Sequence, residues 1–157
     1  MPAGGHGHSA EGHARFAIVR ATFYEDLAER LTAGALKGFA EQGVPAAQVD
    51  TYDVPGAFEL PFGARACADS GRYAGVACLG AVIRGETDHY DWVCQGATYG
   101  IARTQLDTGI PCAFGVLTVD EMAQALARTG GDKRDTGYNA ALAAVQMARL
   151  AARLRES

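Results

Sequence analysis

The residues best suited to chemistry lie together in one stretch, from Cys78 to Tyr90. An apolar run meets Gly85, and a short polar segment then presents Glu86, Thr87 and His89 before a helical pattern begins. Free amides in a tight turn can bind an anion, and a histidine at a helix start can transfer protons near neutral pH. The stretch therefore predicts an anion site beside a general acid or base.

The elements that must position these residues follow from the apolar periodicity. Strands are expected at 16–21, 49–54, 76–83 and 110–117. Helices are expected from 25 to a stop near Gly43, at 57–69 with Pro61 in the first turn, at 90–107, at 118–128 with a Thr118-x-x-Glu121 capping box, and from about 137 to 155.

Four strands that alternate with helices over short connections predict an α/β fold. We expect a three-layer, doubly wound, flavodoxin-like sheet of four parallel strands. Ligands of such sheets bind at the carboxyl ends of the strands. Phe23, the 57–59 turn, the 81–89 stretch and Phe114 are all expected at or near those ends, which predicts a pocket there.

Composition bounds the class of protein. The 157 residues predict one domain, 15–157, after a Gly- and His-rich segment, 1–14, that we interpret as a disordered tail. Histidines in that tail lack fixed geometry, so we expect no metal. A net charge of −4 without a basic block argues against nucleic acid, and no apolar run approaches the ~20 residues of a membrane span. Four cysteines without a C-x-x-C pair, and no signal-peptide pattern, favour a reducing cytoplasm.

Three segments resemble the 6,7-dimethyl-8-ribityllumazine synthase family. They are VPGAFELP at 54–61, LGAVIRGETDHY at 79–90 and FGVLT at 114–118, and the resemblance extends over essentially the whole chain from Phe16 onward. The resemblance implies condensation of 5-amino-6-(D-ribitylamino)uracil with 3,4-dihydroxy-2-butanone 4-phosphate, the penultimate step of riboflavin biosynthesis. Phosphate and water are released, and no cofactor is required.

The resemblance also implies roles for individual residues. Phe23 would stack on the pyrimidine, and the ring and ribityl chain would be bound by Ala57, Phe58 and Glu59. Main-chain contacts to the same substrate would come from Ala81, Val82 and Ile83, and Phe114 would line this pocket from a neighbouring subunit. The phosphate would be bound by Gly85, Glu86, Thr87 and Arg128, with His89 as general acid/base.

The chemistry suits these roles, because the condensation loses water, moves protons on carbon and eliminates phosphate. Each residue also has a simpler interpretation. Phe23 could belong to the core, Glu59 and Arg128 could complement helix dipoles, Thr87 could cap a helix, and His89 could be a surface residue.

The chain departs from the family pattern near the site. Thr22 stands where Arg is common, Thr136 where Lys is usual, and Asn139 where an acid is thought to orient the histidine. Asp88 adds a negative charge to the anion loop. Lys133 or Arg134 could replace the missing cation.

Two other functions compete with the enzyme. One is a low-activity, lumazine-synthase-like protein that binds flavin or lumazine or forms a shell, and Thr136 and Asn139 keep this alternative open. The other, a flavodoxin-like electron carrier, is disfavoured because Thr22-Phe23-Tyr24 is no Ser-, Thr- and Gly-rich phosphate loop.

The resemblance implies a homo-oligomer with active sites between subunits: a pentamer, a decamer or a 60-subunit shell. An N-terminal strand from a neighbouring subunit could extend the sheet, and riboflavin synthase is a candidate partner. The Ala-rich last helix, with Met147, Leu150 and Leu154 along one stripe, independently suggests self-association.

Overall fold

A four-stranded parallel sheet forms the centre of the protein. The computed structural model describes residues 14–130 and 134–156. The strands are β1 (Phe16–Ala21), β2 (Val49–Val54), β3 (Gly75–Ile83) and β4 (Cys112–Val119), in the order β2-β1-β3-β4. The helices are α1 (Glu25–Glu41), α2 (Leu60–Asp69), α3 (His89–Thr108), α4 (Met122–Ala127) and α5 (Thr136–Arg155), with 3-10 turns at Ala46–Gln48 and Ala57–Glu59. The predicted α/β, doubly wound fold class is confirmed.

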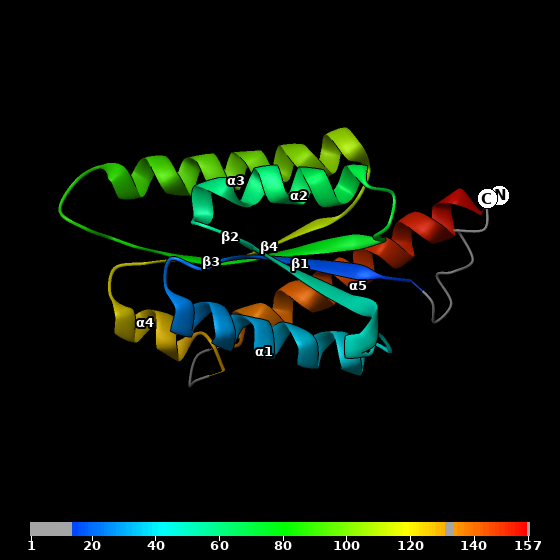
Figure 1. Cartoon of the computed structure of the whole chain (residues 1–157), viewed down its shortest axis with the longest axis horizontal. Helices are drawn as coiled ribbons and strands as arrows, with labels where there is room; N and C mark the ends of the chain where they lie inside the picture. Colours follow the sequence, from blue (N-terminus) through cyan, green and yellow to red (C-terminus); the bar gives the residue numbers. More distant parts are fainter. Residues whose placement is uncertain (1–13, 131–133, 157) are drawn as a thin grey trace.

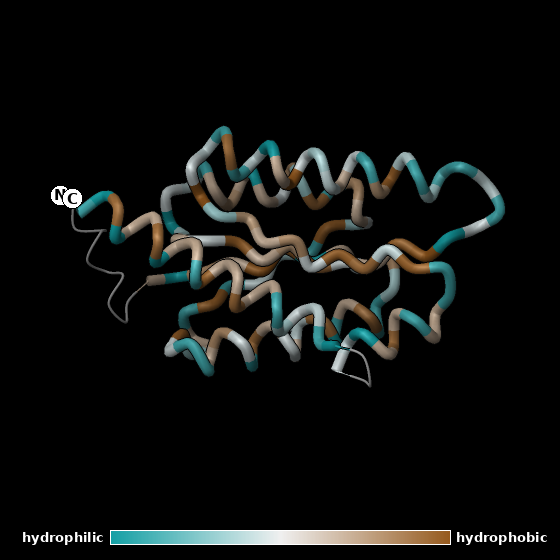
Figure 2. The backbone as a smooth tube through the Cα atoms, turned by 180° about the vertical axis from the view of Figure 1, so that it is seen from behind, coloured by the Kyte–Doolittle hydropathy of each residue, from teal (hydrophilic) through white to brown (hydrophobic). Residues whose placement is uncertain are grey.

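Helices cover both faces of this sheet. In Figure 1, α2 and α3 lie above the strands, and α1, α4 and α5 lie below them. Alternate residues of β1 serve the two layers: Phe16 and Ile18 pack with α1 and α5, whereas Ala17 and Val19 pack with α2 and α3. β3 is buried along most of its length, as expected for a central parallel strand covered on both faces. The same layering is visible in the hydropathy of the chain, with apolar strands between helices of mixed polarity (Figure 2).

The helix start after β4 differs from the prediction. Thr118 is part of β4, which ends at Val119, so it is not the N-cap of a helix. The N-cap is Glu121, whose side chain accepts the Gln124 backbone N–H while the Gln124 side chain binds back to the Glu121 backbone. The sheet extends the chain through Thr118 because β3 pairs with β4 as far as Ile83 and Val119, and this pairing outweighs the local capping signal.

Helices α1 and α5 approach each other closely where α5 begins. A Cβ on Gly137 would lie 2.0 Å from the Leu31 carbonyl oxygen, and one on Gly34 would lie 2.2 Å from Asp135 Oδ1. Asp135 also caps α5, since its Oδ1 accepts the Tyr138 N–H at 3.2 Å. These contacts hold the start of α5 against α1.

The expected tail, 1–14, lies almost wholly outside the described residues; Ala14 is described, and it packs against the core. The predicted stop of the first helix is confirmed, because Gly43 follows α1 with φ 86°. Within residues 14–130 and 134–156, no helix is long and apolar enough to cross a membrane.

Candidate active site

The sheet order creates a ligand crevice at a defined place. β1 lies between β2 and β3 in the sheet. The chain therefore passes from β1 to β2 on one side of β1, and the next connection crosses over to place β3 on the other side. In open α/β sheets, ligands bind at such a switch point, outside the carboxyl ends of the strands. Those ends lie at the left of Figure 1, where β1 leads to Phe23, β2 leads to the Ala57–Glu59 turn, and β3 leads to the loop before His89.

Phe23 is a surface aromatic rather than a core residue. Its side chain is 74% exposed, and its ring meets Tyr24 edge-on, with 4.9 Å between the centroids. The residue before it is held in place, because the Thr22 backbone N–H donates to the Val54 carbonyl at 2.9 Å. One face of the Phe23 ring can therefore act as a stacking platform.

The Ala57–Glu59 turn is held against α3 by two glycines. A Cβ on Gly96 would lie 2.5 Å from the Phe58 ring, and one on Gly100 would lie 2.5 Å from Pro61. Only glycine leaves room for the turn to approach the helix this closely. Ala57 is buried, while Phe58 and Glu59 are exposed, so the turn presents an aromatic ring and a carboxylate at the crevice.

The end of β3 has an edge that β1 does not use. The ladder between β1 and β3 ends at Arg20 and Leu79, whereas the ladder to β4 continues to Ile83. The main chain from Ala81 to Ile83 therefore runs beyond β1 and can bond a ligand on that side, as the sequence analysis expected for these residues.

The loop after β3 is exposed to solvent. A Cβ on Gly85 would meet no heavy atom within 4 Å, so this backbone faces open space. Glu86 and Thr87 are exposed, and Thr87 Oγ1 accepts the His89 backbone N–H at 3.2 Å. Thr87 therefore satisfies one free N–H of the first turn of α3, although the N-cap itself is Asp88. His89 is the first residue of α3 and is exposed.

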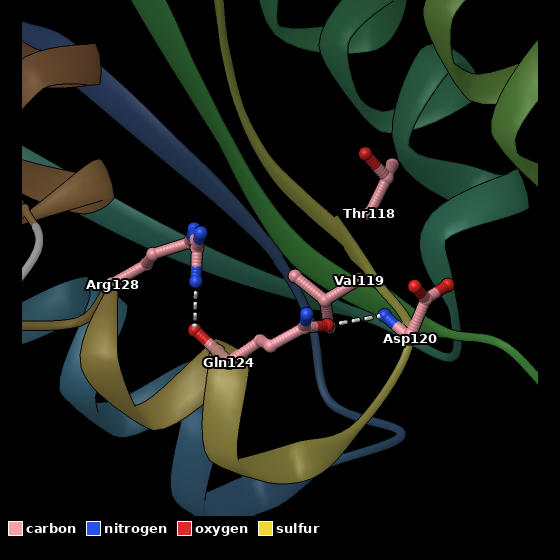
Figure 3. A pocket seen from close by; sticks show the side chains of 5 residues that line it. All are labelled: Thr118, Val119, Asp120, Gln124 and Arg128. Carbon is pink, nitrogen blue, oxygen red and sulfur yellow. Dashed lines mark hydrogen bonds between the residues drawn. The ribbon is translucent and has the colours of Figure 1, made fainter.

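Arg128 lies beyond β4, immediately after α4. Its Nη1 donates to the Gln124 carbonyl at 3.0 Å, and it lines an open cavity of about 160 Å³. The other lining residues are Thr118, Val119, Asp120 and Gln124, and Figure 3 shows that they come from the end of β4 and from α4. Sequence reasoning missed these four residues because it ended the strand at Leu117 and so did not place Asp120 and Gln124 at the carboxyl edge.

Phe114 does not join the other residues. It is the third residue of β4 and pairs with Cys78, five residues before the end of β3, which at ~3.3 Å per residue is roughly 16 Å from the carboxyl edge. The expectation that it lies at this edge within one chain was wrong, because the strand begins at Cys112 and continues to Val119. Its ring is 44% exposed on an edge strand.

The departures from the family pattern lie in two places. Asp88 and Asn139 are exposed, and they belong to the start of α3 and to α5, respectively. Thr136 donates its N–H to the Arg128 carbonyl at 2.9 Å, so the position where the family has lysine adjoins Arg128. Arg134 is exposed close by, with its N–H bonded to the Ala127 carbonyl, whereas Lys133 lies outside the described residues.

The cysteines offer no reactive thiol at the crevice. Burial raises the pKa of the Cys112 thiol to about 12 and raises the pKa of Cys78 well above its usual value. A buried thiol with a raised pKa is a poor nucleophile. Among residues 14–130 and 134–156, no group of three potential ligands could hold a metal ion.

Fold and site together define a class: a flavodoxin-like α/β enzyme with an exposed aromatic ring, a strand end that β1 leaves uncovered, an exposed glycine-containing loop and a histidine near one switch point. Sequence comparison makes the family explicit. The model of the 6,7-dimethyl-8-ribityllumazine synthase family matches residues 13–152. Proteins of that name are 46% identical over 144 residues in Salinibacter ruber (92% of each chain) and 44% identical over 143 residues in Desulfatibacillum aliphaticivorans and in Deinococcus deserti (91% of this chain and 92% of each relative).

The chain belongs to the 6,7-dimethyl-8-ribityllumazine synthase family. The predicted family and the predicted enzyme class, a transferase of riboflavin biosynthesis, are confirmed, and the low-activity binding or shell protein is not favoured. Small-molecule substrates and assembly into oligomers go with membership of this family.

Proposed function

We propose that the protein condenses 5-amino-6-(D-ribitylamino)uracil with 3,4-dihydroxy-2-butanone 4-phosphate to give 6,7-dimethyl-8-ribityllumazine, phosphate and water. The observation that carries this proposal is the convergence of three chain segments at the β1/β3 switch point. They supply an exposed aromatic ring, an unpaired strand end, and an anion loop that leads into His89.

The pyrimidine binds between β1 and β3 in this proposal. Phe23 stacks on the ring, and the main chain of Ala81, Val82 and Ile83 bonds its polar edge. Ala57, Phe58 and Glu59 hold the ring and ribityl chain. Support comes from the exposed faces of Phe23 and Phe58 and from the β3 edge that β1 leaves uncovered.

The phosphate of the second substrate binds to the loop after β3. Gly85, Glu86 and Thr87 present the backbone, and Arg128 supplies the positive charge for a charge-assisted hydrogen bond. His89 transfers protons as the amine adds to the ketone, water leaves, and phosphate is eliminated. Holding the two substrates side by side supplies much of the remaining rate.

The protein's own cation near Arg128 replaces the family lysine. Arg134 is one candidate for this role, because its backbone N–H donates to the carbonyl of Ala127, the residue before Arg128. Lys133 is the other candidate. We expect Arg134→Ala or Lys133→Ala to weaken binding of the phosphate substrate; unchanged turnover and affinity in both variants would show that neither residue takes this role.

The oligomer is proposed to be a pentamer with active sites between subunits. Trp92, Tyr99 and Leu106 follow one another at seven-residue spacing on α3, so they form one stripe, and they are 68%, 66% and 80% exposed. Phe62 on α2 is 81% exposed. A contiguous stripe of exposed apolar side chains, such as the one on α3, marks an interaction surface more often than scattered single residues do.

Phe114 reaches the pyrimidine pocket of a neighbouring subunit in this assembly, since it is exposed on an edge strand and distant from its own crevice. β2, the opposite edge, is free to pair with an N-terminal strand of a neighbour. Sedimentation separates a pentamer from a decamer or a 60-subunit shell, and a single-chain mass refutes the proposal. We also propose that the protein works in the cytoplasm and that riboflavin synthase is its partner.

The decisive experiment mixes the purified protein with both substrates and follows lumazine absorbance. Failure to form product above the spontaneous background would refute the proposed enzyme activity and would favour a binding or shell protein. His89→Ala is expected to slow turnover without abolishing it, because proximity of the substrates remains. A variant as fast as the wild type would remove His89 from proton transfer.

A further inference from the structure

Arg84, the residue between β3 and the loop that begins at Gly85, is held through its backbone and through its half-exposed guanidinium. Its backbone N–H donates to the Val119 carbonyl at 2.9 Å. Its Nε lies 3.0 Å from Asp120 Oδ1, its Nη1 lies 3.9 Å from Asp91 Oδ1, and its guanidinium carbon lies 4.2 Å from the centre of the Tyr90 ring. Three contacts, two from α3 and one from the residue that follows β4, thus meet on this side chain.

These contacts join the two ends of the loop. Arg84 precedes Gly85 and Tyr90 follows His89, so the guanidinium on the Tyr90 ring closes the segment that bears the phosphate-binding backbone and the histidine. Tyr90 is itself held, because it is partly buried and packs against the core layer between the sheet and helices α2 and α3. Cation–π contact and a charge-assisted hydrogen bond both favour this closed arrangement.

The second anchor connects the loop to the element that carries Arg128. Asp120 accepts from Arg84, and its own backbone N–H donates to Gln124 Oε1 at 2.7 Å. The Gln124 carbonyl in turn accepts from Arg128 Nη1 at 3.0 Å. Figure 3 shows this path from Asp120 through Gln124 to Arg128. Movement of Arg84 would therefore disturb both the loop and the end of β4.

A direct role in binding phosphate is the competing explanation for an arginine beside Gly85. The guanidinium, however, already faces the carboxylates of Asp120 and Asp91. An anion that approached it would meet both negative charges. The geometry therefore favours a positioning residue over a ligand.

We propose that Arg84, Tyr90 and Asp120 form a clamp that holds the loop from Gly85 to His89 in its binding conformation. The inference deepens the proposed function, on which it rests. Arg84 acts through the backbone of Gly85 and Thr87 and through the orientation of His89, without touching substrate.

Two measurements on the full-length protein test the clamp: amide hydrogen exchange of the loop without substrate, and steady-state kinetics. Arg84→Ala should speed exchange of the hydrogen-bonded amides at the two ends of the loop, those of residue 84, His89 and Asp91, by about 10-fold or more, as expected when a local restraint is lost. It should raise KM for the phosphate substrate about 10-fold and leave KM for the pyrimidine within about 2-fold, where 10-fold corresponds to ~1.4 kcal/mol. Arg84→Lys should rescue only part, because an ammonium lacks the planar fork that stacks and bonds together.

Asp120→Asn separates the two explanations and serves if Arg84→Ala fails to fold. A clamp predicts faster loop exchange and a higher KM for the phosphate substrate. A direct ligand predicts unchanged exchange and an equal or lower KM, because a competing carboxylate charge has gone. Either of the latter two results overturns the clamp.

Arg103→Ala is the matched control. Arg103 lies on α3, away from the loop, and makes a similar exposed ion pair. Its Nε is 3.0 Å from Asp107 Oδ2, and its Nη1 is 2.9 Å from the Tyr99 hydroxyl. It should change neither readout. If the wild type makes no lumazine, the proposed function fails while loop exchange still tests the clamp; wild-type exchange in Arg84→Ala refutes the clamp whatever the activity.

Discussion

Gly137 provides a test in which helix propensity and packing predict opposite signs. It is the second residue of α5, so Gly137→Ala should stabilise the helix by up to about 1 kcal/mol if propensity alone decided. The added Cβ would lie 2.0 Å from the Leu31 carbonyl oxygen, 2.9 Å from its carbonyl carbon and 3.1 Å from its Cα. Ordinary contacts are 3.4–4 Å, so α5 must move away from α1 by about 1 Å or more.

The obstacle is backbone, so no side-chain rotation can relieve it. Overpacking of this kind costs typically ~1–3 kcal/mol, occasionally more, and we expect a net loss of about 2 kcal/mol after the propensity gain. For a chain of this size that loss corresponds to a fall in Tm of roughly 4–8 °C. Phosphate affinity should fall as well, because Thr136 donates to the Arg128 carbonyl and moves with α5.

Thermal and urea unfolding at one protein concentration measure the change, since an oligomer's Tm depends on concentration. Asn139→Ala, at an exposed position two residues further along α5, is the control and should be neutral or slightly stabilising. A Gly137→Ala protein as stable as the wild type, or more stable, would refute the packing argument.

Three further outcomes are expected. Arg128→Ala should raise KM for the phosphate substrate by about 10-fold or more, the ~1.5–3 kcal/mol of a charged hydrogen bond, in initial-rate assays; an equal KM would exclude the phosphate role. Gly96→Ala should displace the Phe58 ring, which its Cβ would approach to 2.5 Å, and weaken pyrimidine binding measured by titration, with little effect on the phosphate substrate. The Tyr73 hydroxyl donates to Asp50 Oδ2 at 2.7 Å and lowers the pKa of that carboxyl, so stability from this contact is present above the unfolded-state pKa of ~3.9 and is lost as pH falls through the folded-state pKa. Urea midpoints between pH 7 and pH 3 should therefore fall more steeply for the wild type than for Asp50→Asn, and parallel curves would contradict the assignment.

Much of the fold follows from local pattern. The bounds of β1 and β2 agree with the strands predicted at 16–21 and 49–54, and the order of strands and helices was predicted throughout. Local sequence suffices for β1 because a buried strand needs an apolar run, and it suffices for the ends of elements because they need breakers such as Gly43 after α1 and Pro55-Gly56 after β2. The residue types between Cys78 and Tyr90 likewise predicted a candidate site at the loop and His89, and the resemblance of three segments to the family implied the roles of these residues.

Contacts between distant residues are a different matter. Glu121 rather than Thr118 caps α4, because pairing with β3 keeps Thr118 in β4. For the same reason β4 continues five residues beyond Phe114, which therefore does not lie at the carboxyl edge. The bond from Arg84 to Asp120 joins residues 36 apart in sequence, which no local periodicity encodes. Residue types and their order determined the family, the fold class and the candidate chemistry. Only the packing of β3 against β4, and of α5 against α1, decided which side chains meet, because register and close approach depend on partners that lie far away in the chain.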